Sequence, residues 1–154
     1  MAEDISWVRT FARIFHREPE DLRTYSPLTL AYIGDAVYEM VVRTLLVENG
    51  NIPVNHLHQK ATQMVKASAQ AELIRNLEPF LDLEEKSIYR RGRNAHSPTM
   101  AKHASMSDYR HATGFEALIG YLYLGGRENR MLELIREGLS SLPENKEEEN
   151  TDGE

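Results

Sequence analysis

The sequence of 154 residues contains no cysteine, which excludes disulfide bonds, zinc–thiolate sites and a thiol nucleophile. A chain without cysteine suits a reducing compartment, and we expect a cytoplasmic protein. The N-terminal segment lacks the continuous apolar stretch of a secretion signal, and no later segment reaches the ~18 uncharged apolar residues of a membrane-spanning helix. We therefore expect neither secretion nor membrane insertion.

Strand patterns and several familiar catalytic motifs are also missing. No segment alternates convincingly between apolar and polar residues, no internal repeat is present, and no glycine-rich phosphate loop follows a strand. Serine and histidine occur without a nucleophile-elbow context. With 41% hydrophobic and 27% charged residues, the chain has the composition of one soluble domain, and we predict that it is all-α.

The net charge of −6 is unevenly distributed along the chain. Residues 144–154 contain six acidic residues and one lysine, a net of −5, which leaves −1 for residues 1–143. The segment 86–111 has six basic residues, one acidic residue and three histidines. We expect the acidic tail to be disordered, and the basic segment is a candidate for binding a polyanion. The plainer alternative is a solvated loop whose arginines pair with acidic residues of the same chain.

Proline, glycine and the spacing of apolar residues predict a chain of helices. The expected helices span residues 3–16, 27–49, Pro53 to Pro79, 82–91, 108–124 and 127–142. The helix over 27–49, with Pro27 in its first turn and Gly50 after its end, is the central element. We divide the chain into an N-terminal extension (1–26), one folded domain (27–142) and the tail (143–154).

Asp35 and Glu116 each lie in apolar helical sequence. In the predicted helix around Asp35, apolar residues fall on every side, which indicates burial on several faces. A buried carboxylate needs a partner, because its desolvation costs several kcal/mol. A satisfied structural group is the commoner explanation. The alternative is a site for a hard cation such as Mg²⁺, which binds oxygen ligands and could support phosphodiester hydrolysis.

The strings TLAYIGDAVYEMVVRTLL and TGFEALIGYLYL, in this order and at this separation, resemble the two signature helices of the ribonuclease III catalytic domain. MVKASAQAELI, RRGRNAH and the segment Tyr-Arg-His-Ala-Thr-Gly-Phe-Glu resemble more narrowly the Mini-III ribonucleases. The resemblance covers residues 27–142. It implies a ribonuclease III-like endonuclease domain, a compact helical bundle that forms a two-fold dimer.

The same resemblance implies a divalent-cation-dependent endoribonuclease that cuts double-stranded RNA, one strand per subunit, and leaves 5′-phosphate and 3′-hydroxyl ends. Asp35 and Glu116 occupy the catalytic and metal-binding positions, with Mg²⁺ as the expected cofactor. Full-length ribonuclease III usually has two more acidic residues, where this chain has Ala31 and Thr113. Water could fill the missing coordination positions, so the number of metal ions stays open. For Glu39, an ion pair with Arg43 one turn later is the simpler role.

No segment after residue 142 is long enough for the family's double-stranded-RNA-binding domain, so we expect the catalytic domain itself to bind RNA. The candidate RNA-binding residues are Arg90, Arg91, Arg93, Asn94, Lys102 and His103. The apolar excess of the helix over 27–49 predicts a two-fold dimer interface, although a monomeric core helix would also explain it. The residues expected to form that interface are Tyr32, Ile33, Val37, Met40 and Val41.

The function implied by the resemblance is maturation of the precursor of 23S ribosomal RNA, whose flanking stem is the expected substrate. A large-subunit ribosomal protein is a further possible partner, and no membrane is expected. Two alternatives remain open. The first is a non-catalytic dimer that binds double-stranded RNA during ribosome assembly, and the second is an all-α protein-interaction module whose arginines bind an acidic partner.

Overall fold

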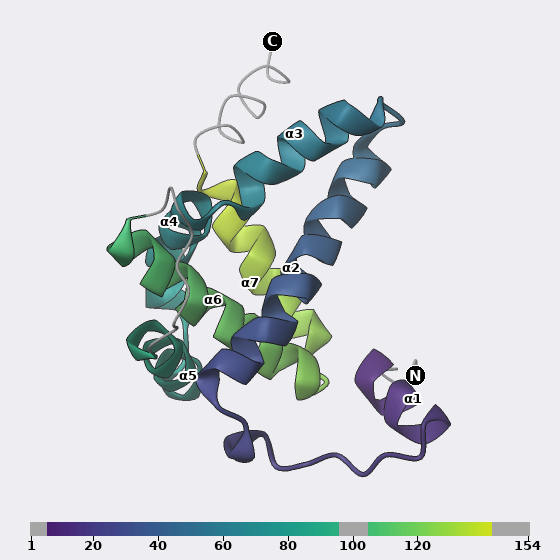
Figure 1. Ribbon diagram of the computed structural model, residues 1–154, viewed down its shortest axis with the longest axis vertical. Coiled ribbons are helices and arrows are strands. Elements are labelled where there is room, and N and C mark those ends of the chain that lie inside the picture. Colours follow the sequence, from purple (N-terminus) through teal and green to yellow (C-terminus); the bar gives the residue numbers. More distant parts are fainter. Residues whose placement is uncertain (1–5, 96–104, 143–154) are drawn as a thin grey trace.

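The computed structural model describes residues 6–95 and 105–142 of the chain (Figure 1). Within these ranges the structure is built from helices and turns and contains no strand, which confirms the all-α prediction. The elements are α1 (Trp7–Ile14), η1 (Leu22–Thr24), α2 (Pro27–Asn49), α3 (Val54–Val65), α4 (Ala67–Leu77), η2 (Glu78–Phe80), α5 (Leu83–Asn94), α6 (Met106–Leu124) and α7 (Glu128–Ser140). In the described part of the chain, no helix is long and apolar enough to cross a membrane.

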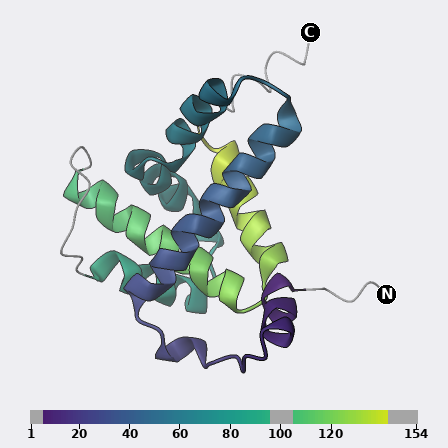
Figure 2. The ribbon, with the colours of Figure 1, turned by 45° about the vertical axis from the view of Figure 1, so that its right-hand side comes forward.

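Helix α2 has the bounds that the sequence predicts, because its end signals are local. The side chain of Ser26 accepts a hydrogen bond from the backbone N–H of Thr29, and Pro27 occupies the first turn. Gly50 follows its last residue. Helix α6 begins in the same way, at Ser105, whose side chain accepts from the N–H of Asp108. These two helices cross at the centre of the fold, with α4 and α5 packed against α6 (Figures 1 and 2).

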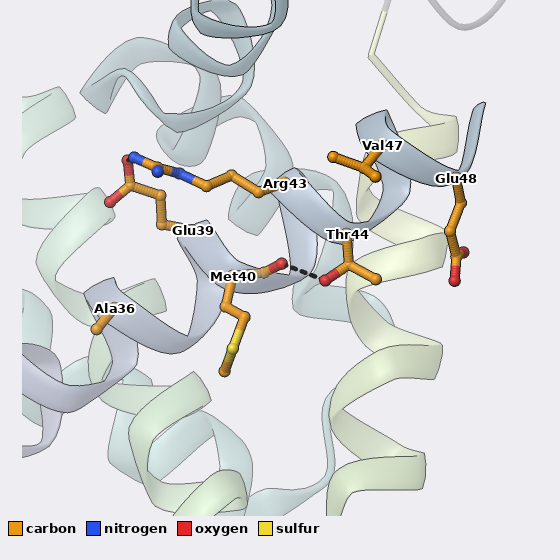
Figure 3. A pocket seen from close by; sticks show the side chains of 7 residues that line it. All are labelled: Ala36, Glu39, Met40, Arg43, Thr44, Val47 and Glu48. Atoms are coloured by element: carbon orange, nitrogen blue, oxygen red, sulfur yellow. Dashed lines mark hydrogen bonds and ion pairs between the residues drawn. The ribbon is translucent and has the colours of Figure 1, made fainter. Parts of the chain in front are cut away.

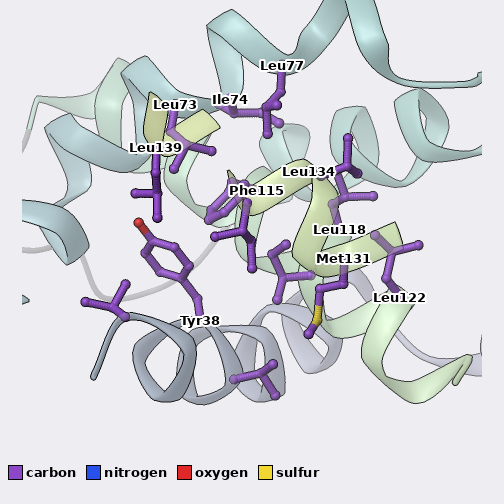
Figure 4. Packing of buried hydrophobic residues seen from close by; sticks show 14 of the residues in the cluster. Tyr38, Leu73, Ile74, Leu77, Phe115, Leu118, Leu122, Met131, Leu134 and Leu139 are labelled. Atoms are coloured by element: carbon purple, nitrogen blue, oxygen red, sulfur yellow. The ribbon is translucent and has the colours of Figure 1, made fainter. Parts of the chain in front are cut away.

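The hydrophobic core lies between α2, α4, α6 and α7 (Figure 4). Tyr38 of α2 and Phe115 of α6 are fully buried, and their rings meet edge to face with centroids 5.0 Å apart. Leucine and isoleucine side chains from α4 and α7 surround this pair. The central crossing of α2 and α6 is therefore held by apolar packing from both sides, which makes it a rigid platform for polar residues nearby.

The helix predicted from Pro53 to Pro79 is two helices in the structure, so that prediction was wrong. Lys66 has extended backbone angles (φ −60°, ψ 152°) and separates α3 from α4. The hydroxyl of Tyr38 donates to the carbonyl of Met64 at 2.8 Å, and the amide of Gln70 donates to the carbonyl of Val65 at 2.8 Å. These side chains satisfy carbonyl groups that the end of α3 leaves free, which stabilises the break.

A buried ion pair connects α5 to α7. Glu85 is fully buried, and Arg130 bonds both of its carboxylate oxygens, at 2.8 and 3.0 Å. Glu85 also completes a capping box with Asp82 at the start of α5. These hydrogen bonds hold the pKa of Glu85 below its ordinary value against the opposing effect of burial. The pair therefore fixes the start of α5 against the α7 helix.

The N-terminal helix α1 is shorter than the predicted helix over 3–16, of which residues 3–5 lie outside the described ranges. Its start is attached to the turn between α6 and α7. The hydroxyl of Ser6 donates to Glu128 at 3.1 Å, and the ring of Trp7 meets that of Tyr123 edge to face at 6.0 Å. Gly126 in this turn has a φ of 69°, the left-handed region that favours glycine.

Candidate active site

Two glycines bring the backbones of α2 and α6 into direct contact. A Cβ atom on Gly34 would overlap the carbonyl oxygen of Glu116, and a Cβ atom on Gly120 would overlap the carbonyl oxygen of Leu30. No other residue type could occupy either position without moving the helices apart. Because Asp35 directly follows Gly34, this crossing places Asp35 beside Glu116.

The carboxyl groups of Asp35 and Glu116 lie close enough to interact, and Asp35 contributes to a raised pKa of Glu116. Asp35 is exposed and Glu116 is half-buried, so the expectation that Asp35 is enclosed on several sides was wrong. That expectation treated the apolar side chains all round α2 as buried, whereas several of them face solvent. The structure thus places the two predicted catalytic residues together at the edge of the core, where one of them is open to solvent.

The carboxyl group of Glu116 is strongly perturbed. Burial has the largest effect on this group, and the interactions with the carboxyl group of Asp35 add to it. Together they raise the pKa of Glu116 to about 9. With its pKa raised to about 9, Glu116 keeps its proton at neutral pH in the metal-free protein. A cation that binds through Glu116 must therefore displace this proton.

The raised pKa of Glu116 makes the stability of the metal-free protein depend on pH. A carboxyl group with a raised folded-state pKa stabilises the protein fully below its unfolded value near 4.5 and loses that contribution as pH rises toward 9. We expect Glu116→Gln, which cannot ionise, to stabilise the metal-free protein by about 1 to 3 kcal/mol at pH 7. Thermal unfolding in chelator between pH 5 and 9 should show the difference in Tm growing with pH.

The matched control for this experiment is Glu133→Gln, which neutralises an exposed carboxylate on α7. Its effect on Tm should be small and nearly independent of pH. If the difference in Tm between wild type and Glu116→Gln stayed constant across this pH range, the pKa of Glu116 would not be raised in the folded protein.

The chemistry of the two carboxylates suits a hard divalent cation, which takes oxygen ligands and keeps several waters. Within residues 6–95 and 105–142, no third acidic residue or histidine joins the pair to make a larger ligand cluster. Glu39 instead forms the predicted ion pair with Arg43, at 3.0 Å. Asp35 and Glu116 would thus hold a cation with water completing its shell.

Ala31 and Thr113 cannot supply the missing ligands. Both side chains are buried, Ala31 among apolar residues of α5 and α6. The hydroxyl of Thr113 donates to the carbonyl of Tyr109 in its own helix, at 3.0 Å. The structure therefore gives this site two protein carboxylates at most from these four positions.

Helix α5 carries the predicted RNA-binding arginines and lies against α6. A Cβ atom on Gly92 would come within 2.9 Å of the Cα atom of Gly114, so the two helices touch two residues before Glu116. Arg90, Arg91 and Asn94 are exposed, and Arg93 is half-buried. Of the other predicted RNA-binding residues, Lys102 and His103 lie outside the described residues.

Arg93 is positioned by the aromatic ring beneath it. Its guanidinium lies 5.5 Å from the ring centroid of Tyr89, a cation–π contact that orients the side chain. Tyr89 itself is buried against Gly114 of α6. Sequence reasoning did not identify Tyr89, although its position four residues before Arg93 on one helix face was an available signal.

A groove with a volume of about 630 Å³ runs along the exposed side of α2 (Figure 3). Of the residues expected at a dimer interface, Tyr32 and Met40 are exposed on α2, and Ile33 and Val41 are half-buried. Val37 was wrongly included, because it lies in the core. The groove itself is lined by Ala36, Glu39, Met40, Arg43, Thr44, Val47 and Glu48.

Comparison with known proteins agrees with this geometry. Residues 28–127 match the family model described as "Ribonuclease III domain". Proteins named "Mini-ribonuclease 3" are similar over most of the chain. The one from Clostridium tetani is 50% identical over 118 residues, which cover 76% of this chain and 78% of the relative. The one from Staphylococcus aureus is 42% identical over 123 residues, 78% of this chain and 91% of the relative.

A solved structure shows the same fold. The crystal structure of protein FN1578 from Fusobacterium nucleatum superimposes with a TM-score of 0.69 at 31% sequence identity, covering 76% of this chain and 93% of that chain. Asp35, Glu116 and the crossing glycines all lie within the residues that match the family model. The chain therefore belongs to the ribonuclease III domain family, among proteins of the Mini-ribonuclease 3 type.

Proposed function

We propose that this ribonuclease III-type endoribonuclease hydrolyses phosphodiester bonds of double-stranded RNA at Asp35 and Glu116. The observation that carries the proposal is the pair of interacting carboxyl groups at the crossing of α2 and α6. We assign residues 27–142 as the catalytic domain, with residues 1–26 as an N-terminal extension and 143–154 as an acidic tail.

The two carboxylates and the apolar residues beside them have different roles in the proposed reaction. Asp35, open to solvent, and Glu116, once it has released its proton, would hold a divalent cation, for which we propose Mg²⁺. The cation supplies a bound water of lowered pKa and neutralises charge that grows on the phosphate. Leu30, Ala31 and Ala117 beside the pair are buried and apolar, which limits how far the carboxylates can move.

Exposed basic residues near the site provide the RNA-binding surface. Arg90 and Arg91 on α5 point away from the core, and Arg93 is held over Tyr89. A-form RNA presents phosphates and 2′-hydroxyl groups across a wide, shallow minor groove, which a fixed set of arginines can recognise by shape. The contact of α5 with α6 keeps these arginines at a constant distance from the carboxylates.

A second surface suited to RNA lies on α3. Residues 49–71 contain no acidic residue, although the whole chain has 24. In α3 only Ala61 is buried, so His56, His58 and Lys60 are exposed to solvent. A protruding helix without acidic residues can approach a phosphate backbone without charge repulsion. The absence of acidic residues from this segment is visible in the sequence but was not used as a prediction.

The proposed active form is a homodimer. Tyr32 is 82% exposed, which is unusual for a large aromatic side chain in the middle of a domain, and the apolar groove of α2 lies on the same helix. A second copy would cover this surface. Two sites related by a two-fold axis could then cut the two antiparallel strands of one duplex.

As the physiological substrate we propose the stem that flanks precursor 23S ribosomal RNA, processed in the cytoplasm, with a large-subunit ribosomal protein as a possible additional partner. The similarity to Mini-ribonuclease 3 proteins supports this choice. The second candidate function is non-catalytic binding of double-stranded RNA in ribosome assembly. Ala31 and Thr113, at positions where full-length ribonuclease III usually has acidic residues, favour that alternative.

Incubation of the purified protein with a perfectly paired RNA duplex tests the proposal directly. We expect cuts in Mg²⁺ that disappear in excess chelator and that leave 5′-phosphate ends, with no cutting of single-stranded RNA or duplex DNA. Duplex RNA that is bound tightly but never cut would support the non-catalytic alternative. The absence of both binding and cutting would overturn both functions.

The role of the α5 arginines can be tested through the salt dependence of binding. The logarithm of the association constant should fall linearly with the logarithm of salt concentration, and Arg91→Gln or Arg93→Gln should each reduce the slope by about one. Filter binding in excess chelator, where we expect no cutting, measures the slope. Arg136→Gln is the control, since it removes an exposed arginine of α7 that is not among the predicted RNA-binding residues. A slope that does not change excludes the substituted arginine from the interface.

A further inference from the structure

Helix α3 is held to the domain by few side chains. Of its residues only Ala61 is buried, and Leu57, Met64 and Val65 are half-buried. The helix packs mainly against α2 and α4, and in Figure 1 it extends from α4 toward the far end of α2. A helix with so small a buried surface gains little free energy from packing. Single hydrogen bonds therefore have a large share in fixing its direction.

The hydroxyl group of Tyr38 holds the C-terminal end of α3. It donates to the carbonyl oxygen of Met64 at 2.8 Å, in the last turn of the helix, where carbonyl groups have no partner inside the helix. Tyr38 is fully buried, and its ring packs edge to face against Phe115 (Figure 4). Burial raises the pKa of Tyr38 above its ordinary value, so the hydroxyl keeps its proton and remains a donor. The position of this donor is therefore set by the core and not by α3.

The second side-chain bond at this end of α3 comes from the adjacent helix. The amide of Gln70 donates to the carbonyl of Val65, but Gln70 lies on α4, which begins directly after the bend at Lys66. Tyr38 lies on α2, three residues and about 4.5 Å along the helix axis after Asp35. Its hydroxyl thus connects α3 to the helix that carries a proposed catalytic carboxylate.

One side of α3 has polar side chains that suit an RNA duplex. His56, Gln59, Lys60 and Gln63 recur at spacings of three and four residues, and all are exposed. Amide and basic side chains can bond phosphates and 2′-hydroxyl groups. A tilt of α3 by about 10° about Met64 would move the backbone at His56, about 12 Å along the axis, by about 2 Å. That displacement exceeds the ~0.5 Å over which hydrogen-bond lengths vary, so the tilt decides whether these side chains meet the duplex together.

We propose that Tyr38 is a positioning residue for RNA binding, whose hydroxyl group fixes the tilt of α3 relative to the carboxylate pair of Asp35 and Glu116. This role rests on the proposed binding of RNA by α3. Tyr38 is buried and acts on the duplex only through the exposed side of α3. Loss of its hydroxyl leaves the ring in the core and allows α3 to tilt.

The variant Tyr38→Phe removes the hydroxyl group and retains the ring. We expect it to bind a perfectly paired RNA duplex at least about five-fold more weakly in excess chelator, because α3 then meets the duplex in a range of orientations. In single-turnover cleavage with Mg²⁺, the enzyme concentration at half-maximal rate should rise by the same factor. The maximal rate should stay within about two-fold of wild type, because the two carboxylates are unchanged.

A double-mutant cycle with Lys60 distinguishes positioning of α3 from a general loss of stability. Lys60→Gln removes one basic side chain from α3 and should weaken duplex binding about five-fold when Tyr38 is present. Combined with Tyr38→Phe, the same substitution should weaken binding by less than about two-fold, because much of that contact is already lost.

The matched control is Ser6→Ala, which also removes one buried hydroxyl group, in this case a donor to Glu128 of α7. Tyr38→Phe and Ser6→Ala should each lower the free energy of unfolding by about 1 kcal/mol. Only Tyr38→Phe should weaken duplex binding. Equal weakening by both variants would attribute the effect to lost stability and overturn the role of Tyr38.

The remaining outcomes separate this inference from the proposed function. Binding by Tyr38→Phe as tight as that of wild type, or an effect of Lys60→Gln that is the same with and without the Tyr38 hydroxyl, would overturn the positioning role alone. Unchanged binding by Lys60→Gln would remove α3 from the RNA-binding surface and the role of Tyr38 with it, while the arginines of α5 are tested separately. A wild-type protein that neither binds nor cuts duplex RNA would overturn the proposed function itself.

Discussion

Replacing Asp35 with asparagine should lower the rate of duplex-RNA cleavage by at least about 1,000-fold, which corresponds to about 4 kcal/mol of lost transition-state stabilisation. The amide has no negative charge with which to hold a cation, and Glu116 alone would leave the cation bound by one protein carboxylate. Asp35 is exposed, so the substitution should leave the fold unchanged. Single-turnover cleavage of a labelled duplex in Mg²⁺, with enzyme in excess, measures the chemical step.

Binding and cutting must be measured together in this experiment. Asp35→Asn should bind the duplex within a few-fold of wild type, because the RNA-binding surface that we propose is on α5 and α3 rather than at the carboxylates. Glu133→Gln is the control, since it neutralises an exposed carboxylate of α7 that neither belongs to the pair nor lines the groove of α2. Cleavage by Asp35→Asn at a rate near that of wild type would exclude Asp35 from the catalytic machinery.

Replacing Gly34 with alanine should destabilise the protein by about 3 kcal/mol or more, and should also impair catalysis. The added methyl group overlaps the carbonyl oxygen of Glu116, which belongs to a helix backbone and cannot rotate away as a side chain would. The helices must separate, which opens the core around Tyr38 and Phe115 and moves Asp35 away from Glu116. A fall in Tm of about 6 °C or more is the expected readout for a domain of this size.

Gly50→Ala provides the control for this prediction, because it makes the same chemical change at the C-terminal end of the same helix. A Cβ atom at Gly50 has no neighbour within 4 Å, and its φ of 163° is extended backbone that alanine can adopt. Its Tm should lie close to that of wild type. If Gly34→Ala were as stable as Gly50→Ala and fully active, the crossing of α2 and α6 could not be as tight as described.

The sequence predicts those parts of the fold that depend on local signals. Helix α2 has its predicted bounds because Ser26, Pro27 and Gly50 act on the adjacent backbone. The break at Lys66 was not predictable in the same way. It is stabilised by hydrogen bonds from Tyr38, 26 residues before its acceptor, and from Gln70 on the following helix. Apolar residues continue at helical spacing on both sides of the break, so their periodicity alone predicts one uninterrupted helix.

The candidate site, like the fold, was predictable from the sequence only in part. Asp35 and Glu116 were identifiable from their apolar surroundings and from the family resemblance, yet nothing in the sequence indicates that Asp35 is exposed. Apolar residues surround α2 both where it packs and where it faces solvent, and only the packing of other helices distinguishes the two. Gly34 and Gly120 can be read from the sequence, but the sequence does not show that they allow the backbones of α2 and α6 to touch.

The crossing of α2 and α6 also has a mechanical consequence. Gly34 is the pivot about which the two helices would rock, and Asp35 is one residue, about 1.5 Å along the axis, from that pivot. A rocking motion of about 5° would displace the far end of α2, about 22 Å away, by about 2 Å, but would displace the backbone at Asp35 by only about 0.1 Å. Thermal motion of the helix ends therefore has almost no lever arm at the backbone of Asp35, which moves far less than the surfaces around it.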